Sequence, residues 1–287
     1  MRAATWWRRG ARLAVLLALL LTPLLALAAA RAAEPMPDPP GGSEVLPLGP
    51  AFGILTLPRT APPTGHRSAG RRPGEPWPVA ILLPDVDGGT TGVIAYGDRL
   101  LENGIALLES PEGAEARTEA WLAAGLAAIA GDARLDGRRV AVLGLGAGAR
   151  AALLALAAQP APMAAPMAAP VALALLYPGC DATLAEAARG LAVGRVLLLH
   201  GEADPANGAA ACEALAAAIP PAARARRRML AGTGYGWDAL GLAPPGAALL
   251  LPDPTGQGGR LRAWPDPAAT LVAADHLLGF LLAAFGR

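Results

Sequence analysis

Three glycine-containing segments hold the residues best placed for chemistry, and the first two of them begin with an apolar run. The first segment, Val140–Gly148, ends in Gly-Leu-Gly-Ala-Gly. The second, Leu197–Pro205, ends in His-Gly-Glu-Ala-Asp-Pro, and the third, Leu230–Asp238, ends in Gly-Thr-Gly-Tyr-Gly-Trp-Asp. An apolar strand that enters a glycine turn and then a helix is the context in which many acyl-transfer enzymes present a nucleophile. Such enzymes also need a base that activates the nucleophile and a third group that orients the base.

Carboxylates recur directly after the predicted strands and in the last of these segments. Where strands are parallel, their carboxyl ends share one edge of the sheet, and ligands gather there. A cluster of this kind can bind a hard cation or a cationic small molecule, but helix caps and turns use the same residue types. We expect the capping and turn roles, with no metal and no cofactor, and a structural role for His200. The carboxylates are Asp85, Asp87, Glu109, Asp181, Asp204 and Asp238.

Apolar runs that alternate with helical segments predict a doubly wound, mostly parallel sheet with helices on both faces. Runs that are apolar on both faces, such as Val79–Leu83, are typical of central parallel strands. Residues 240–262 are expected to form an irregular insertion. The predicted strands are 79–83, 105–108, 139–143, 171–176 and 196–199, and the predicted helices are 94–102, 118–130, 147–158, 209–219 and 267–285.

The first 33 residues predict an export signal rather than a part of the fold. Arginines precede the apolar run Leu13–Ala30, which closes with Ala-Arg-Ala-Ala. This layout is typical of a secretory signal cleaved after Ala32 or Ala33, and an uncleaved membrane anchor is the alternative. We therefore expect a signal at 1–33, a Pro/Gly-rich segment with edge strands such as Phe52–Leu57 at 34–74, and one α/β domain at 75–287. The protein is expected to be exported, either periplasmic or secreted.

The charge and cysteine content narrow the class of protein further. With 24 basic and 23 acidic residues the net charge is +1, which excludes the strongly basic surface typical of nucleic-acid binders. A hydrophobic share of 54% is enough for one sizeable core. The two cysteines, Cys180 and Cys212, can pair as a disulfide or remain as buried thiols, and both alternatives are open.

In order and spacing, the three glycine-containing segments resemble the dienelactone-hydrolase-like branch of the α/β-hydrolases, over residues 75–287. That family has a nucleophile elbow, then a His-Gly-x-x-Asp loop with the acid, then a Gly-x-x-His-Gly loop with the histidine. The resemblance implies an α/β-hydrolase sheet and a lineage that hydrolyses small esters or lactones. We expect ligand contacts at Asp85 and Val86 in the oxyanion loop and at Ala147 beside the elbow, and also at Glu109, which follows a predicted strand.

When the catalytic triad of the family is mapped onto this sequence residue by residue, only one of its three residues is retained. Asp204 stands at the acid position, whereas the nucleophile position is Gly146 and the histidine position is Tyr235. Glycine has no attacking atom, and tyrosine, with an ordinary pKa of about 10, is a poor base at neutral pH. Glycine also suits the unfavourable backbone of an elbow. We therefore expect a non-catalytic or altered hydrolase relative that binds a small-molecule ligand at the former active-site edge.

Two other functions stay open at this point. One is an active hydrolase that uses Ser110 or Cys180 with Asp204, because both candidates follow predicted strands. The other is a dinucleotide-binding protein, because Gly144–Ala149 fits the Gly-x-Gly-x-x-Ala turn. That motif requires an acidic residue at the end of the next strand, and Asp181 comes too late. No nucleic-acid partner is expected, and a membrane partner only through an uncleaved signal.

Overall fold

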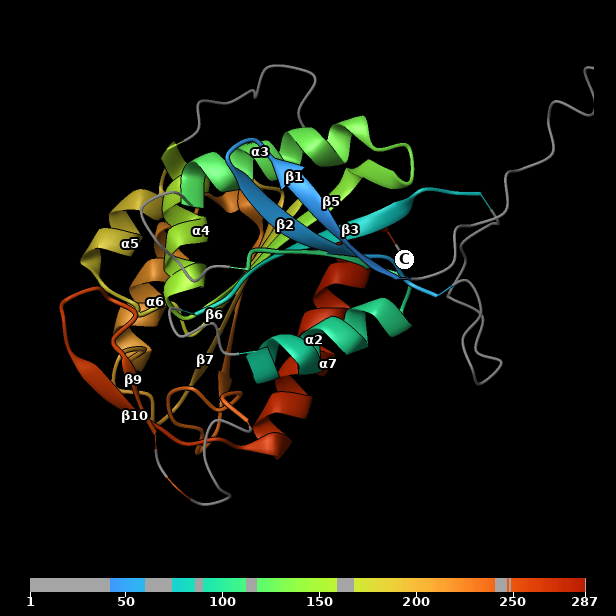
Figure 1. Cartoon of the computed structure of the whole chain (residues 1–287). Helices are drawn as coiled ribbons and strands as arrows, with labels where there is room; N and C mark the ends of the chain where they lie inside the picture. Colours follow the sequence, from blue (N-terminus) through green and yellow to red (C-terminus); the bar gives the residue numbers. More distant parts are fainter. Residues whose placement is uncertain are drawn as a thin grey trace, which may run out of the picture. The chain divides into compact units, whose positions relative to one another are not determined.

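Eight strands form one mixed sheet at the centre of the fold (Figure 1). The computed structural model describes residues 42–59, 74–85, 90–111, 118–158, 168–240, 247 and 249–286. The elements belong to one compact unit, residues 39–71 and 75–287. The strands of this sheet are β1 (Ser43–Leu48), β2 (Ala51–Thr56), β3 (Trp77–Leu83), β4 (Ala106–Glu109), β5 (Leu135–Leu145), β6 (Ala172–Leu176), β7 (Arg195–Gly201) and β8 (Ala225–Leu230).

The strand order is β1-β2-β4-β3-β5-β6-β7-β8. The strands from β4 to β8 in this order are parallel, while β1 and β2 form an antiparallel pair and β2 runs antiparallel to β4. Every residue of β3 and β6 is buried, as expected for central parallel strands whose two faces are both covered. The carboxyl ends of β3, β5, β6, β7 and β8 therefore meet at one edge of the sheet.

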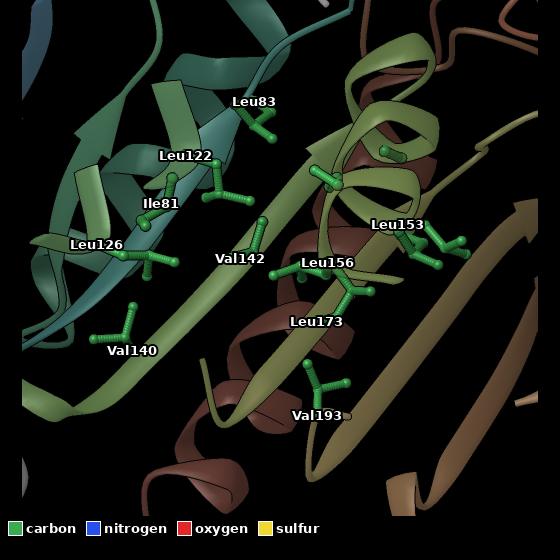
Figure 2. Packing of buried hydrophobic residues seen from close by; sticks show 14 of the residues in the cluster. Ile81, Leu83, Leu122, Leu126, Val140, Val142, Leu153, Leu156, Leu173 and Val193 are labelled. Carbon is green, nitrogen blue, oxygen red and sulfur yellow. The ribbon is translucent and has the colours of Figure 1, made fainter. Parts of the chain in front are cut away.

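The sheet divides the apolar core into two clusters, and helices cover both of its faces. Successive strand residues point to opposite faces, so Ile81 belongs to one cluster and Leu82 to the other. Figure 2 shows the first cluster, where Val142 and its neighbours on the strands face Leu122 of α3 and Leu156 of α4. Helices α3 to α6 contribute to this cluster, and α2 and α7 to the other. The helices are α2 (Thr90–Glu102), α3 (Thr118–Gly131), α4 (Ala147–Ala158), α5 (Ala182–Ala188), α6 (Ala209–Ala218) and α7 (Pro267–Ala284).

The last helix, α7, is a core helix by its packing. Among the described residues it is the one helix long and apolar enough to cross a membrane by length and composition. Asp266 caps its start by accepting hydrogen bonds from the backbone N–H groups of Ala268 and Ala269. Its buried residues, including Leu277 and Leu281, belong to the cluster that covers β6 and β7. One face of α7 thus packs inside the protein, whereas Leu271 and Val272 on this helix are exposed.

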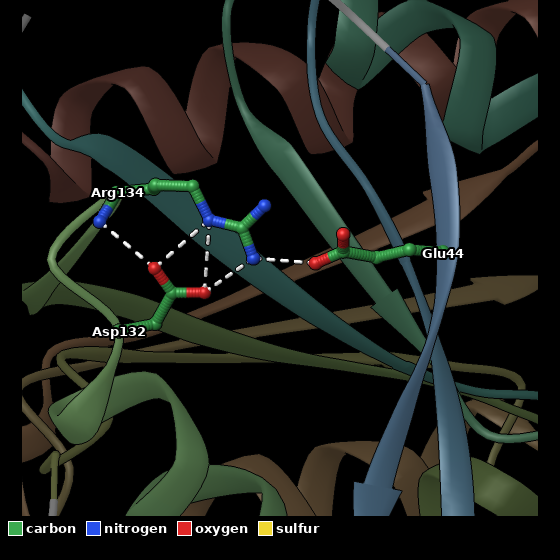
Figure 3. A network of polar contacts seen from close by, with 3 residues as sticks. All are labelled: Glu44, Asp132 and Arg134. Carbon is green, nitrogen blue, oxygen red and sulfur yellow. Dashed lines mark hydrogen bonds and ion pairs between the residues drawn. The ribbon is translucent and has the colours of Figure 1, made fainter. Parts of the chain in front are cut away.

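An ion-pair network connects the edge strand β1 to residues 132–134, which lie directly before β5 (Figure 3). Arg134 donates hydrogen bonds to both carboxylate oxygens of Asp132 and to Glu44 on β1. The Arg134 guanidinium lowers the pKa of Asp132 below its usual value through these hydrogen bonds. Because the network is partly exposed, we assign it a role in orientation rather than a large share of the stability.

The structure confirms the predicted α/β fold and differs from the predicted elements in detail. The edge strands expected in the N-terminal segment are β1 and β2, which pair with each other and join the same sheet. The expectation of an irregular insertion at 240–262 is wrong, because β9 (Leu249–Pro252) and β10 (Arg260–Ala263) pair there as a second, two-stranded antiparallel sheet. The predicted signal lies outside the described residues.

Candidate functional site

The turn after β5 needs glycine for reasons of space and backbone conformation. Gly146 has a φ of +51°, in the left-handed region that glycine adopts most easily. A Cβ at Gly148 would lie 2.3 Å from the carbonyl oxygens of Leu83 and Pro84, and a Cβ at Gly144 would lie 2.3 Å from the Cα of Ala149. Helix α4 therefore begins in close contact with the end of β3. This is the strained strand–turn–helix arrangement of a nucleophile elbow.

The carboxylate of Asp85 fills the space where a nucleophile would stand. A Cβ built on Gly146 would lie 2.2 and 2.6 Å from the two Asp85 oxygens and 2.3 Å from the carboxyl carbon. Any side chain at position 146 would therefore collide with Asp85. One Asp85 oxygen also accepts a hydrogen bond of 3.0 Å from the backbone N–H of Ala147. Because that N–H follows the elbow residue, it is the donor that an active enzyme of this fold uses for its oxyanion hole.

Tyr235, at the position of the family's histidine, is the second partner of Asp85. Its hydroxyl lies 3.0 Å from an Asp85 oxygen and 3.1 Å from the carbonyl oxygen of Pro252, and donates toward both acceptors. Tyr235 is fully buried, and burial raises its pKa well above the usual value, with the negative charge of Asp85 adding to the effect. Tyr235 is thus a hydrogen-bond donor at neutral pH and cannot act as a base there.

Asp204, the acid of the predicted triad, is engaged by its own loop. Its oxygens accept hydrogen bonds from the backbone N–H of Ala206 at 2.9 Å and from the side-chain amide of Asn207 at 3.0 Å. Burial raises the pKa of Asp204 to about 6, and these hydrogen bonds oppose that shift. The Asp204 charge still contributes to the raised pKa of Tyr235, so the acid and histidine positions remain neighbours. Because position 235 holds no histidine that Asp204 could orient, the role of Asp204 is to stabilise its own loop through these hydrogen bonds.

The loops after β7 and β8 are held together by backbone contacts. The N–H of Ala203 donates to the carbonyl of Thr233 at 2.9 Å, and the N–H of Gly232 donates to the Glu202 carboxylate at 2.9 Å. A Cβ at Gly201 would lie 2.2 Å from the Thr233 carbonyl oxygen, so this approach requires glycine. These contacts fix Asp204 relative to Tyr235.

A second layer of aromatic and acidic residues lies behind Tyr235. Tyr177, which follows β6, donates a hydrogen bond of 2.6 Å to Asp238, and its ring packs edge-on against the rings of Tyr235 and Trp237. The indole N–H of Trp237 donates to the hydroxyl of Tyr96 on α2 at 3.1 Å. The three tyrosines of the chain therefore all lie at this site. Tyr96 and Tyr177 belong to no sequence motif, so the sequence alone does not indicate their place at the site.

Cys180 and Cys212 form a disulfide that joins the loop after β6 to α6. Next to it, the side-chain oxygen of Asn207 accepts hydrogen bonds from the backbone N–H groups of Gly179 and Cys180, at 3.0 and 3.3 Å. Because a disulfide sulfur has no thiolate to offer, Cys180 cannot be the nucleophile of a hydrolase in this state.

Ser110 and Glu109 lie at the end of β4, away from Asp204. Four strand spacings separate β4 from β7 in the sheet order, which amounts to roughly 19 Å. Ser110 therefore cannot be activated through Asp204. Glu109 is half-buried, and this burial raises its pKa. Val86, predicted as a ligand contact, lies outside the described residues.

Asp181 and His200 have structural roles, and Asp87 lies outside the described residues. Asp181 caps α5 by accepting the N–H of Leu184 at 2.8 Å and pairs with Arg150 at 2.9 Å. His200 is buried, with one ring nitrogen 3.1 Å from the Gly201 carbonyl and the other 3.1 Å from a guanidinium nitrogen of Arg227. Among the residues that the structure describes, no group of three or more His, Cys, Asp or Glu side chains is arranged to hold a metal ion.

The geometry of the Gly144–Ala149 turn does not favour a dinucleotide. In a dinucleotide fold the helix that follows such a turn binds pyrophosphate at its N-terminus. Here the Asp85 carboxylate is hydrogen-bonded to the first N–H of α4, at Ala147. A phosphate would have to displace this carboxylate and would be repelled by its charge.

Comparison with known proteins shows the fold but not a close relative. No family model matches the sequence, and no curated protein matches it. Among solved structures, a Klebsiella pneumoniae protein assigned as a dienelactone hydrolase has a TM-score of 0.58 at 15% identity, covering 86% of this chain and 98% of its own. A dienelactone hydrolase-like promiscuous phosphotriesterase from metagenomic libraries has a TM-score of 0.57 at 17% identity, covering 85% and 98%. The carboxylesterase Cest-2923 from Lactobacillus plantarum has a TM-score of 0.58 at 14% identity, covering 85% and 97%.

Nearly the whole length of each of these three structures aligns with this chain. The mostly parallel sheet agrees with the predicted fold, and the turn between β5 and α4 and the loops after β7 and β8 follow one another along the chain in the order of the three segments. The chain has the α/β-hydrolase fold, in the form found in dienelactone-hydrolase-like proteins and related esterases.

Proposed function

We propose that this protein is a non-hydrolytic member of the α/β-hydrolase fold, exported from the cytoplasm, that binds a small molecule at the former active-site edge. The observation that supports the proposal most is the position of the Asp85 carboxylate, 2.2 Å from the place of a Cβ on Gly146. One side chain thus replaces the nucleophile and engages the Ala147 N–H.

Three separate requirements of ester hydrolysis are affected. Gly146 supplies no attacking atom, and Tyr235 remains protonated and donates to Asp85 rather than accepting a proton. The Ala147 N–H, which would stabilise an oxyanion, already serves a carboxylate. Loss of an oxyanion donor alone costs about a hundredfold or more in rate, and loss of the nucleophile and the base costs far more.

A carboxylate nucleophile at Asp85 is not a convincing substitute. Attack of its oxygen on an ester would place the new oxyanion beside a hole whose Ala147 donor is already used by Asp85 itself. The Tyr235 hydroxyl also donates to the same carboxylate, which lowers its nucleophilicity. No group at the histidine position could then activate water to release the acyl group.

Export is supported by the sequence of the first 33 residues. A disulfide between Cys180 and Cys212 is consistent with a periplasmic or secreted protein, because disulfides persist in oxidising compartments. A ligand site at the edge of the sheet is supported by the general position of ligands in open α/β folds.

We expect the mature protein to hydrolyse short aryl esters and a simple lactone no faster than its Asp204→Ala variant, because no residue is in place to attack the carbonyl carbon. The measurement is the rate of product formation at equal concentrations of folded wild type and variant. Hydrolysis by the wild type that is lost in Asp204→Ala would show a nucleophile elsewhere and would overturn the proposal.

A further inference from the structure

A buried carboxylate that the proposed function does not use lies three residues after Tyr235. Asp238 is 3% exposed. One of its oxygens accepts the 2.6 Å hydrogen bond from Tyr177. The other oxygen is sealed from solvent and has no hydrogen-bond partner among the described residues. The Tyr96 hydroxyl is close enough to affect the titration of Asp238 but does not reach hydrogen-bond geometry with it.

A negative charge in this position is costly. A buried carboxylate needs several donors to replace its water, and Asp238 has one good donor and one unpaired oxygen. Burial raises its pKa to about 6, with the charge of Asp85 adding to the shift and the tyrosine hydroxyls opposing it. The neutral acid is therefore the form that the surroundings stabilise.

Asp238 stands where three elements meet. Tyr96 belongs to α2, Tyr177 follows β6, and Trp237 belongs to the loop after β8. Trp237 donates to Tyr96 and packs against Tyr177, so the group around Asp238 joins α2 to both loops. Tyr96 itself is fully buried and belongs to the apolar cluster on the face that α2 and α7 cover.

The residues around Asp238 lie next to the hydrogen-bonded pair of Asp85 and Tyr235. Helix α2 begins at Thr90, five positions after Asp85, so its placement bears on the segment that carries this carboxylate. Tyr235 lies in the same loop as Asp238 and packs edge-on against Tyr177. A change at Asp238 therefore bears on Tyr235 through their shared loop and through Tyr177.

We propose that Asp238 is a proton-operated latch, whose neutral form holds α2 against the loops after β6 and β8 and whose ionised form loosens α2. The groups that face it are Tyr96 from α2, Tyr177 from the loop after β6, Tyr235 from its own loop and Asp85 from the end of β3. Ionisation places a charge on a carboxylate that has a sealed, unpaired oxygen, and hydrating that oxygen requires the packing between α2 and the two loops to open. The latch does not depend on whether the protein hydrolyses esters.

The sign of the pH effect follows from the direction of the pKa shift. The folded-state pKa of Asp238 is raised from 3.8 to about 6, so its contribution to stability is full at low pH. This contribution is lost as the pH rises through 6. Closing of the latch is therefore favoured at about pH 5 and opposed at about pH 7.5.

Hydrogen exchange of α2 tests the latch. The wild type, Asp238→Asn and the matched control Asp204→Asn are compared at about pH 5 and pH 7.5, with rates corrected for intrinsic exchange. Asp204→Asn removes a carboxylate whose pKa is also raised to about 6 but whose hydrogen bonds go to its own loop, at Ala206 and Asn207. We expect protection of α2 to fall by about tenfold or more between the two pH values in the wild type and in Asp204→Asn, and to stay constant in Asp238→Asn.

Equal protection of α2 at both pH values in the wild type would overturn the proposal, as would an unchanged pH dependence in Asp238→Asn. If Asp238→Asn does not fold, a carboxyl titration of the wild type by carbon-13 NMR decides the question. A buried carboxyl group that titrates near 6, together with the tyrosine and tryptophan signals of the group, would support the latch. Full ionisation of Asp238 at pH 5 would contradict it.

Discussion

Replacing Gly146 with alanine is expected to lower the free energy of unfolding by about 2–4 kcal/mol. The new Cβ would lie 2.2 Å from an Asp85 oxygen and 2.3 Å from its carboxyl carbon, so Asp85 must leave the Ala147 N–H. The backbone at position 146 also has a φ of +51°, which alanine adopts at a cost. Chemical denaturation of the wild type and the variant at pH 7 measures the difference.

Two further variants separate the collision from the backbone strain. Gly49 has a φ of +67° with nothing within 4 Å of its Cβ position, so Gly49→Ala reports strain alone. In the double variant Asp85→Ala/Gly146→Ala the collision is removed, and we expect a coupling free energy of about 1–3 kcal/mol between the two sites. Equal losses of stability in Gly146→Ala and Gly49→Ala, with no coupling to Asp85, would contradict the placement of the carboxylate.

Removing the disulfide is expected to cost about 3–4 kcal/mol of stability and to lower the melting temperature by about 10 °C. The bond joins residues 32 positions apart, so reduction frees a long loop in the unfolded chain. It also lies beside Asn207, which ties the Asp204 loop to the backbone of Gly179 and Cys180. Thermal unfolding of the wild type and the double variant Cys180→Ala/Cys212→Ala provides the measurement.

The control for this prediction is the same protein with and without reductant. The oxidised wild type should show no reactive thiol after unfolding, and the reduced wild type should show two. Reductant should lower the melting temperature of the wild type and leave that of the double variant unchanged. Identical melting of the oxidised wild type and the double variant would show that the bond does not form.

The fold could be predicted because its signals are local and strong. The run Val79–Leu83 is apolar on both faces, and the structure buries it between two layers of helices as part of β3. The turn at Gly144–Gly148 is marked by glycines that the close approach of α4 to the end of β3 requires. Such features depend on neighbouring residues and on sheet geometry, which a single sequence contains.

The arrangement of the site could be predicted only in part, because its decisive contacts are long-range. The sequence identified the positions of Gly146, Asp204 and Tyr235, but Tyr235 contacts an aspartate 150 positions earlier in the chain. No pattern in the sequence indicates that the Asp85 carboxylate lies over the elbow. Similarly, Asn207 looks like a loop residue until its contacts with Asp204 and with the backbone after β6 are seen.

The hairpin between β8 and α7 was missed for a different reason. Proline and glycine in this segment favoured an irregular loop, yet Leu249–Pro252 and Arg260–Ala263 pair in antiparallel register. Both strands of the hairpin contact the site, because Pro252 accepts a hydrogen bond from Tyr235 and Ala263 forms a parallel bridge with Tyr235. Tertiary contacts therefore override the local composition.

Rebuilding the triad tests most directly the claim that Asp85 occupies the place of the nucleophile. Hydrolysis of short aryl esters is measured for the double variant Gly146→Ser/Tyr235→His and for the triple variant that adds Asp85→Gly. In the double variant we expect hydrolysis no faster than the background rate without protein, because Asp85 still engages the Ala147 N–H and collides with the new serine. Activity at least about a hundredfold higher is expected in the triple variant, where the oxyanion donor is free. Equal activity in the double and triple variants, both folded, would contradict the account.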